Sequence, residues 1–349
     1  MIGTSVSAAT GSAAGPAMLL NKPILAGSIL GLIRSFDGVS WSAVGGGFIG
    51  SSVESLVEFN SELIAGGSFY EAGGFAVEGL ARFDGTAWRP FPDQRAGGAE
   101  DLIVHKGELY AGGSWYARGP NDQKTNYAIT GVLRWTGQQW VNVGVNFPSD
   151  TVFTLASYQG RLYAGGFFRG PNQPGDFIAS YDGTSWQSVG GGMAGTVWAM
   201  RPFDPDGPGP MPQQLIVGGS FSMAGSVLAN RIAAWNGSQW SAMGAGVGGT
   251  VRALTEWKGR LVVAGQFFSA GGIDSPGLAF WSCPNAVPCY ANCDASTVMP
   301  TLNVADFVCF MNRFAASDPG ANCDSSTTPP ALNVADFICY VNRFAAGCS

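Results

Sequence analysis

Short apolar segments interrupted by glycine dominate residues 17–281 of the chain. Residues 63–69 read Leu-Ile-Ala-Gly-Gly-Ser-Phe, and they are followed by the alternating segment 79–83, an Asp84-Gly85 turn and Trp88. Period-two alternation interrupted by Asp-Gly or Asn-Gly is a strong signal for a β-hairpin. The stretch is therefore predicted to form a strand, a loop, a second strand, a tight turn and a third strand.

Imperfect copies of this unit follow one another along the chain. The glycine pair recurs at Ala65-Gly66-Gly67, Ala111-Gly112-Gly113, Ala164-Gly165-Gly166, Val217-Gly218-Gly219 and, in weakened form, Ala264-Gly265-Gln266. The turn and its tryptophan recur at Asp37-Gly38 with Trp41, Asp84-Gly85 with Trp88, Thr136-Gly137 with Trp140, Asp182-Gly183 with Trp186, and Asn236-Gly237 with Trp240. An earlier apolar segment in each unit brings the count to four strands, and a period of about 40–50 residues with short strands is typical of a β-propeller.

The residue types in the repeat suit blades that pack face to face. Strands buried on both faces read as nearly continuous apolar runs. Gly and Ala at the end of the second strand let the backbone bulge and let another backbone approach. The tryptophan supplies a large buried surface and an N–H that can reach a carbonyl, and the Asp or Asn of the turn tolerates positive φ and bonds to its own backbone.

The blade count expected from the repeats is about six. Five units have a turn and a tryptophan, and a sixth begins at Val251 and stops at Trp281 without an outer strand. A strand from residues 3–9 would complete it, so we expect a ring of four-stranded blades closed by the N-terminal segment; if Met1 is not the natural start, the protein has more blades. The order of glycine pair, aromatic segment and tryptophan resembles the kelch repeat over residues 17–281. Nothing in the sequence matches the copper ligands of kelch enzymes.

Composition narrows the classes of function. Only 12% of the 349 residues are charged, 52 are glycine, and the net charge is −6. An acidic chain without clustered Lys and Arg argues against nucleic acid as a partner. The apolar segment 18–33 is interrupted and too short for a membrane span. The single histidine, His105, lowers the expectation of an enzyme without deciding it, because most acid–base mechanisms and zinc sites use histidine.

All seven cysteines lie between Cys283 and Cys348. This asymmetry predicts a boundary that separates a propeller domain, 1–282, from a small module, 283–349. Paired cysteines in a small segment indicate an oxidising compartment. We therefore expect an extracellular or cell-surface protein, although residues 1–16 do not resemble a signal peptide.

The module contains a duplication with a period of 30 residues. Asn292-Cys293-Asp294, Leu302-Asn303-Val304-Ala305-Asp306 and Asn312-Arg313-Phe314 repeat as Asn322-Cys323-Asp324, Leu332-Asn333-Val334-Ala335-Asp336 and Asn342-Arg343-Phe344. Each copy is predicted to be an oxygen-rich loop followed by an amphipathic helix whose first turn carries an Asp, where negative charge is favoured. The duplicated loop-helix resembles a dockerin of the Gly-Cys-ending variety found on predicted secreted bacterial proteins, over residues 289–349.

The dockerin resemblance implies two calcium sites, one in each loop. Carried over by position, the ligands would be Asn292, Asp294, Ser296, the carbonyl of Thr301, Asn303 and Asp306 in the first loop, and Asn322, Asp324, Ser326, the carbonyl of Ala331, Asn333 and Asp336 in the second. Calcium takes six to eight hard oxygen ligands. The loops run three residues longer than the EF-hand pattern and lack its glycine, so a metal-free Asx turn that caps each helix is the alternative interpretation.

The cysteine spacing supports a crosslinked module. Cys293 to Cys309 and Cys323 to Cys339 share one spacing, which predicts a disulfide between each loop and its helix. Cys289 and Cys348 bracket the module and are expected to join its ends. Cys283 is then free or intermolecular.

The leading hypothesis is a non-enzymatic, extracytoplasmic binding or scaffold protein. Its propeller would bind a carbohydrate or protein ligand, and its tail would dock on a cohesin-like or cell-surface protein. By analogy with dockerins, the docking surface would include Asn312, Arg313, Asn342 and Arg343, which a solvated helix face explains equally well.

Two other classes stay open. A surface-assembly component would use Cys283 and the tail for self-association. A carbohydrate-active propeller enzyme would need paired carboxylates, and the loops between strands offer no repeated or clustered pair among Glu71, Glu78, Asp122, Asp176 and Asp274. The same loops carry aromatic side chains that would either stack on sugars or pack on the blades, namely Phe69, Trp115, Tyr116, Tyr127, Phe168 and Phe268.

Overall fold

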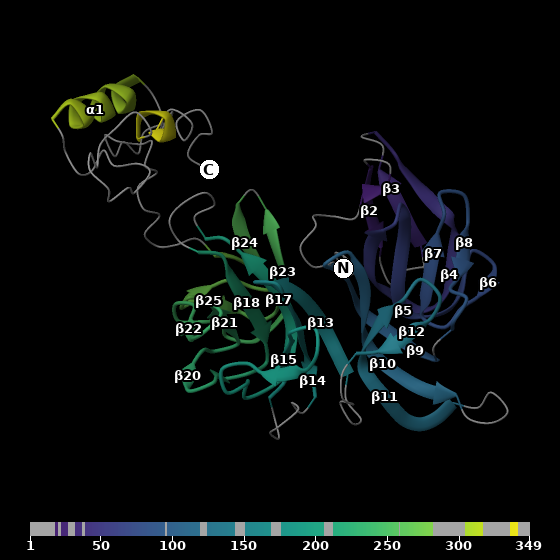
Figure 1. Cartoon of the computed structure of the whole chain (residues 1–349). Helices are drawn as coiled ribbons and strands as arrows, with labels where there is room; N and C mark the ends of the chain where they lie inside the picture. Colours follow the sequence, from purple (N-terminus) through teal and green to yellow (C-terminus); the bar gives the residue numbers. More distant parts are fainter. Residues whose placement is uncertain are drawn as a thin grey trace. The chain divides into compact units, whose positions relative to one another are not determined.

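The computed structural model is mainly β and contains a β-propeller (Figure 1). It describes residues 18–19, 22–26, 32–36, 39–94, 96–118, 124–143, 151–168, 176–205, 212–257, 259–281, 304–316 and 336–340. The chain divides into two compact units. One comprises residues 1–203, 213–255 and 262–279, and the other comprises residues 204–212, 256–261 and 280–349.

Five blades are present in the described residues, each an antiparallel sheet whose strands follow chain order. The first contains the second half of β4 (Trp41–Phe59), β5 (Glu62–Ala72), β7 (Leu80–Phe83) and β8 (Trp88–Pro90). The second contains β9 (Ala96–His105), β10 (Glu108–Arg118), β11 (Lys124–Trp135) and β12 (Trp140–Asn142). The third contains β13 (Thr151–Tyr158), β14 (Arg161–Phe167), β15 (Ile178–Tyr181) and β16 (Trp186–Ser188).

The fourth and fifth blades complete the series. The fourth contains β17 (Val197–Phe203), β18 (Gln214–Gly219), β21 (Ile232–Trp235) and β22 (Trp240–Ala242). The fifth has three described strands, β23 (Thr250–Trp257), β24 (Arg260–Gln266) and β27 (Leu278–Trp281). Short hairpin strands occur in the loops, namely β6 (Phe75–Ala76), β19 (Met223–Ala224), β20 (Val227–Leu228), β25 (Ser269–Ala270) and β26 (Ile273–Asp274).

An additional partial sheet precedes the first blade. It contains β1 (Met18–Leu19), β2 (Lys22–Ala26), β3 (Leu32–Phe36) and the first half of β4. The long strand β4 pairs with β3 through its first half and with β5 through its second half, so it belongs to two successive sheets. The strand expected from residues 3–9 lies outside the described residues, and so does the predicted boundary at 282/283.

The predicted turns form as the sequence indicates. Oδ1 of Asp84 accepts hydrogen bonds from the N–H groups of Thr86 (2.8 Å) and Ala87 (2.9 Å), and Gly85 has φ +96°. Asp182 and Asn236 accept the equivalent bonds in the third and fourth blades. The hydrogen bonds from the Thr86 hydroxyl and from the turn backbone lower the pKa of Asp84 to about 2. These side chains therefore build the turn.

Three of the repeated tryptophans join their blade to the sheet before it. Nε1 of Trp186 donates to the carbonyl of Val143, just after β12, at 2.7 Å. Trp88 and Trp240 make the same bond to Val44 (3.0 Å) and Val189 (3.3 Å). Each indole ring is buried, so one side chain supplies both apolar area and a hydrogen bond between sheets. This confirms the expectation that the indole N–H reaches a carbonyl.

The two glycines of each pair make room for different neighbours. A Cβ on Gly165 would lie 2.5 Å from Cγ1 of Val197 in the next blade. A Cβ on Gly166 would lie 2.1 Å from the carbonyl oxygen of Thr151 in its own blade. The first glycine thus permits close packing between blades, and the second permits a bulge in the facing strand.

In the fifth blade the equivalent of the glycine pair lies one residue earlier than the sequence predicts. Gly265 N donates to the carbonyl of Gly277 at 3.0 Å, as Gly67 N does to that of Gly79. A Cβ on Gly265 would lie 2.1 Å from the oxygen of Thr250, the close approach that defines the second glycine. The equivalent of the glycine pair is therefore Ala264-Gly265, and Gln266 lies outside it. The Ala-Gly-x pattern was misleading because the other copies have Ala or Val before the pair.

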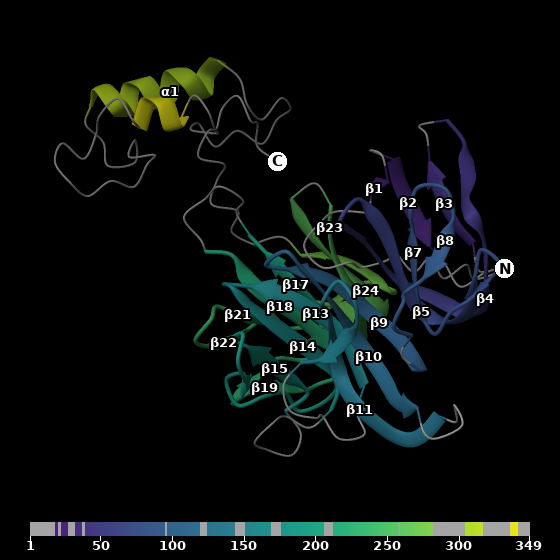
Figure 2. The same ribbon diagram turned by 45° about the vertical axis from the view of Figure 1, so that its right-hand side comes forward.

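Hydrogen bonds tie the innermost strands of successive blades together. The hydroxyl of Ser55 in β4 accepts from the N–H of Leu102 in β9 (3.0 Å), and Oδ2 of Asp101 in β9 accepts from the N–H of Leu155 in β13 (2.7 Å). The hydroxyl of Thr154 in turn accepts from the N–H of Met200 in β17 (3.2 Å). These strands lie side by side (Figures 1 and 2). The bonds join equivalent residues in three successive pairs of blades, so each innermost strand has the same position along the one before it.

The second unit contains the described part of the duplicated module. It has the helix α1 (Val304–Ala315) and the helical residues 336–340. Phe310 of α1 stacks on Tyr340 with ring centroids 3.9 Å apart, and both rings are buried. Cys309 and Cys339 are each disulfide-bonded. Helical residues thus occur in both copies, while the dockerin assignment itself stays a prediction.

Asp101 allows a direct test of the bonds between blades. Besides Leu155, its carboxylate accepts from the N–H of Leu102 (2.9 Å) and from the hydroxyl of Ser55 (3.1 Å). Asp101→Asn replaces one acceptor oxygen by a donor that faces a buried donor, so the free energy of unfolding should fall by about 1–3 kcal/mol. Urea unfolding followed by tryptophan fluorescence measures it.

The matched comparison is Thr154→Ala, which removes the acceptor of the Met200 N–H and one hydrogen bond to Asp101 but places no donor against a donor. Ala199 occupies the equivalent position in the fourth blade, so we expect a smaller loss from this change. Equal stability of Asp101→Asn and the unmodified chain would contradict the role given to this carboxylate.

Candidate functional site

One position on each innermost strand is set apart from its neighbours by an irregularity in strand pairing. In the first four blades the register shifts by one residue, so that two residues on the innermost strand oppose one on its neighbour. The extra residue is Glu54, Glu100, Phe153 or Trp198, and its neighbours in the chain are buried. A β-bulge of this kind leaves one residue unpaired and re-aims its side chain, often next to a functional site.

The fifth blade has the same arrangement with Arg252 at this position. A Cβ on Gly265 would meet the oxygen of Thr250 and the backbone N of Arg252, as a Cβ on Gly166 would meet Thr151 and Phe153. Four of the five side chains are half-buried and that of Arg252 is exposed. We call these five residues the bulge row: Glu54, Glu100, Phe153, Trp198 and Arg252.

Two carboxylates occupy the first two positions of the row. Burial, and then the negative charge of Glu54, raise the pKa of Glu100 from 4.5 to about 7. The carboxylate of Glu54 accepts a short hydrogen bond from the hydroxyl of Ser52. A carboxyl that keeps its proton up to about pH 7 can donate a hydrogen bond as well as accept one.

Aromatic rings and a guanidinium occupy the other three positions. Phe153 stacks on Trp198 with ring centroids 4.2 Å apart and an interplanar angle of 18°. The guanidinium carbon of Arg252 lies 3.8 Å from the centroid of a Trp198 ring. Because a cation over an indole face is attracted to it, these contacts hold the three side chains as one continuous surface.

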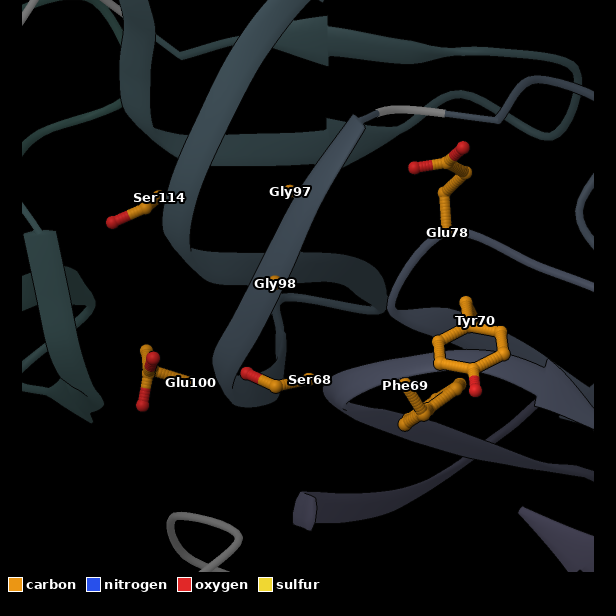
Figure 3. Close-up of a pocket in the computed structure, with 8 residues that line it drawn as sticks. All are labelled: Ser68, Phe69, Tyr70, Glu78, Gly97, Gly98, Glu100 and Ser114. Atoms are coloured by element: carbon orange, nitrogen blue, oxygen red, sulfur yellow. The ribbon is translucent and has the colours of Figure 1, made fainter. Parts of the chain in front are cut away.

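A cavity of about 340 Å³ opens beside Glu100. It is lined by Ser68, Phe69, Tyr70, Glu78, Gly97, Gly98, Glu100 and Ser114. In Figure 3 the two glycines of β9 lie at the centre, with Glu100 and Ser68 towards one end and Glu78 and Tyr70 towards the other. The lining is rich in hydroxyl and carboxylate groups, so the cavity suits a polar ligand.

Three of the loop aromatics, for which sugar stacking and packing on the blades were both open, are part of the core. Phe69, Trp115 and Phe168 are buried, whereas Phe268 is 81% exposed. The side chains of Tyr116 and Tyr127 lie outside the described residues. Buried rings in the first three positions confirm the alternative interpretation, that they pack loop to blade.

The loop carboxylates divide in the same way. Glu78 lines the cavity, Asp274 is exposed, and Asp176 is buried with its backbone oxygen accepting from Met193 N (2.9 Å). Glu71 is half-buried and Asp122 lies outside the described residues. Glu54 and Glu100 lie on the innermost strands and not in the loops where acidic pairs were expected, so they were not predicted. The signal that identifies them is their shared place in the repeat, after Val53 and Ala99.

The single histidine has a packing role. His105 is buried, and its Nδ1 lies 2.7 Å from the hydroxyl of Ser157 on the neighbouring strand. Burial lowers its pKa. His105 thus connects β9 to β13 as a neutral ring.

Most residues predicted for the tail lie outside the described part of the chain. These are the calcium ligands Asn292, Asp294, Ser296, Thr301, Asn303, Asn322, Asp324, Ser326, Ala331 and Asn333, the cysteines Cys283, Cys289, Cys293, Cys323 and Cys348, and Asn342 and Arg343. Within the described residues, Asn312 and Arg313 are exposed on α1, and Asp336 is buried. No cluster of three metal-ligating side chains and no membrane-spanning helix occurs among the described residues.

Comparisons with known proteins find only distant similarity. No family model and no curated protein matches the chain. The structure of YjhT has 13% identity and a TM-score of 0.43, and the match covers 81% of this chain and 97% of that one. The computationally designed Ika8 protein has 15% identity and a TM-score of 0.44, with 78% and 74% covered. At this similarity neither structure bears on the ligand.

Titration of Glu100 tests the electrostatics of the row. We expect its carboxyl to titrate with a pKa of about 7, and Glu54→Gln to lower that pKa while burial keeps it above 4.5. Carboxyl-carbon NMR at a series of pH values measures it, with the Glu100 signal assigned by its loss in Glu100→Gln. Because the folded state holds this proton more tightly than the unfolded state, the contribution of Glu100 to stability is largest below pH 4.5 and is lost as the pH rises through 7. A Glu100 signal that titrates with a pKa of 4.5 would contradict the burial of this carboxyl beside Glu54.

Proposed function

We propose that this chain is a non-enzymatic binding protein whose propeller takes up a ligand at the bulge row. The observation that carries the proposal is the contrast along each innermost strand. In the first four blades the flanking positions are buried, whereas the bulge positions of all five blades are half-buried or exposed and carry acidic, aromatic and basic side chains. A scaffold with uniform packing needs no such variety, and convergent polar and aromatic groups are typical of a ligand site.

A carbohydrate-active enzyme is the second candidate. One observation favours it: burial and the neighbouring charge of Glu54 raise the pKa of Glu100 to about 7. Glycoside hydrolysis uses two carboxyl groups in different protonation states. The stacked rings of Phe153 and Trp198 would hold a sugar plane under this proposal.

The tail is proposed to act as an attachment module outside the cytoplasm. Support comes from the 30-residue duplication, from helical residues in both copies and from the disulfide-bonded Cys309 and Cys339. Under this proposal Cys293 and Cys323 are their partners, the loops bind calcium, and α1 presents Asn312 and Arg313 to a cohesin-like or cell-surface protein. A surface-assembly role through Cys283 belongs to the same proposal.

We also propose that kelch-like repeats close into six blades within residues 1–282. Leu278, the first residue of β27, is 49% exposed, whereas the first residues of β7, β15 and β21 are at most 3% exposed: Leu80, Ile178 and Ile232. In those blades the next sheet covers the residue. A further sheet, of which the partial sheet β1–β3 is part, would cover Leu278 in a closed ring.

A ligand panel tests the binding role. We expect the unmodified chain to bind members of a glycan and peptide array, and Trp198→Ala to weaken this binding roughly tenfold or more because a stacking surface is lost. Phe268→Ala removes an exposed aromatic ring that lies outside the bulge row and should leave binding unchanged. Turnover of a bound glycan, abolished by Glu100→Gln, would instead establish the enzyme.

Calcium titration of the full chain tests the tail. Isothermal titration should show binding that the double variant Asp294→Ala/Asp324→Ala removes, since each loop would lose one of its two carboxylates. Asp274→Ala, an exposed carboxylate on β26, serves as the control. An unmodified chain that binds no calcium would favour the metal-free capping turns.

A further inference from the structure

The bulge row has a chemical order that follows the order of the blades. Its two acidic side chains come from the first and second blades, its two aromatic rings from the third and fourth, and its guanidinium from the fifth. The contacts preserve this order. Glu54 acts electrostatically on Glu100, Phe153 stacks on Trp198, and Trp198 lies against Arg252. The row therefore runs from negative through apolar to positive.

The charges at the two ends are not compensated by ion pairs among the described residues. The ion pairs found there join Arg82 to Glu62, Arg89 to Asp84 and Arg134 to Glu108, and none of them involves Glu54, Glu100 or Arg252. A half-buried carboxylate pair without a cationic partner is unfavourable by itself. An exposed guanidinium with one face on an indole keeps its donors available for a carboxylate.

We infer that the site binds a peptide-like ligand with a cationic group at one end, a flat apolar group in the middle and an anionic group at the other end. The cation would lie against Glu54 and Glu100, the apolar group against the rings, and the anion at Arg252. This inference rests on the proposed binding function and specifies its ligand class.

A cationic group is the ligand group that best reduces the repulsion between the carboxyl groups of Glu54 and Glu100. A positive charge beside Glu54 and Glu100 favours the ionised form of both carboxyls, so binding should release a proton at pH 6–7, where Glu100 is otherwise largely protonated. A neutral sugar would bind without this proton release.

Four probes that share one aromatic residue separate the contributions: acetyl-Lys-Phe-Glu-amide, acetyl-Gln-Phe-Glu-amide, acetyl-Lys-Phe-Gln-amide and acetyl-Gln-Phe-Gln-amide. Isothermal titration at low ionic strength, which limits screening, should show the doubly charged probe binding about tenfold tighter than either singly charged one. Repeating the titration at pH 6.5 in buffers of different ionisation enthalpy measures the proton release.

Variants assign each charge to its end of the row. Glu54→Gln/Glu100→Gln should weaken only the probes that contain Lys, and Arg252→Gln only those that contain Glu, each by about tenfold. Glu58→Gln on the same strand and Arg260→Gln on β24 change exposed charges and should alter no affinity. Thermal unfolding checks that every variant is folded.

The outcomes separate this inference from the binding function beneath it. Equal affinity for all four probes, no binding of any probe, or losses that do not match the charge removed would overturn the ligand class. Array ligands whose binding depends on Trp198 would then still support the binding function. If no member of the array binds and none of the four probes binds, both the ligand class and the binding function are wrong.

Discussion

The hydrogen bonds between innermost strands are the constraint on which the arrangement of the first unit depends. Ser55, Asp101 and Thr154 each accept a backbone N–H from the following blade. Since apolar packing alone is non-directional, these bonds supply the register that the packing lacks. They explain why the bulge positions of the first four blades fall in line, and Arg252 of the fifth blade joins them through its contact with Trp198.

Burial gives Asp101 an unusual place in this network. Burial raises its pKa to about 7, while hydrogen bonds from Leu155, Ser55, Leu102 and Thr154 oppose the shift. A buried group of this kind is tolerated because every acceptor position has a donor. The equivalent residue in the fourth blade is Ala199, so the third polar link is the last of the series among the described blades.

Local features of the fold could be read from the sequence because each has a local physical cause. The turn at Asp84 needs positive φ at Gly85 and a side-chain acceptor, and both are visible in a single blade. Trp186 and the pair Gly165-Gly166 could be predicted equally well. The sequence shows both a large side chain and positions without side chains, and these recur in successive repeats. The five blades of the described chain follow from these signals.

The candidate site could not be predicted in the same way. The residues of the row differ in type, so no repeated letter marks them, and a bulge is set by pairing between strands that the sequence does not display. Glu54 and Glu100 are separated by a full blade and meet only through the register of β4 and β9. The shift of Ala264-Gly265 shows the same limit, because the alignment of that copy was settled by its contacts with Thr250 and Gly277.

The bulge has a consequence for how this protein can diversify. Its extra residue is inserted between buried neighbours but is itself only half-buried or exposed, so this position tolerates more kinds of side chain than the core positions do. A library randomised at these five codons should yield many chains that still fold and that differ in what they recognise. Evolution could then change the ligand of the propeller through single substitutions in the row, while the blades stay the same.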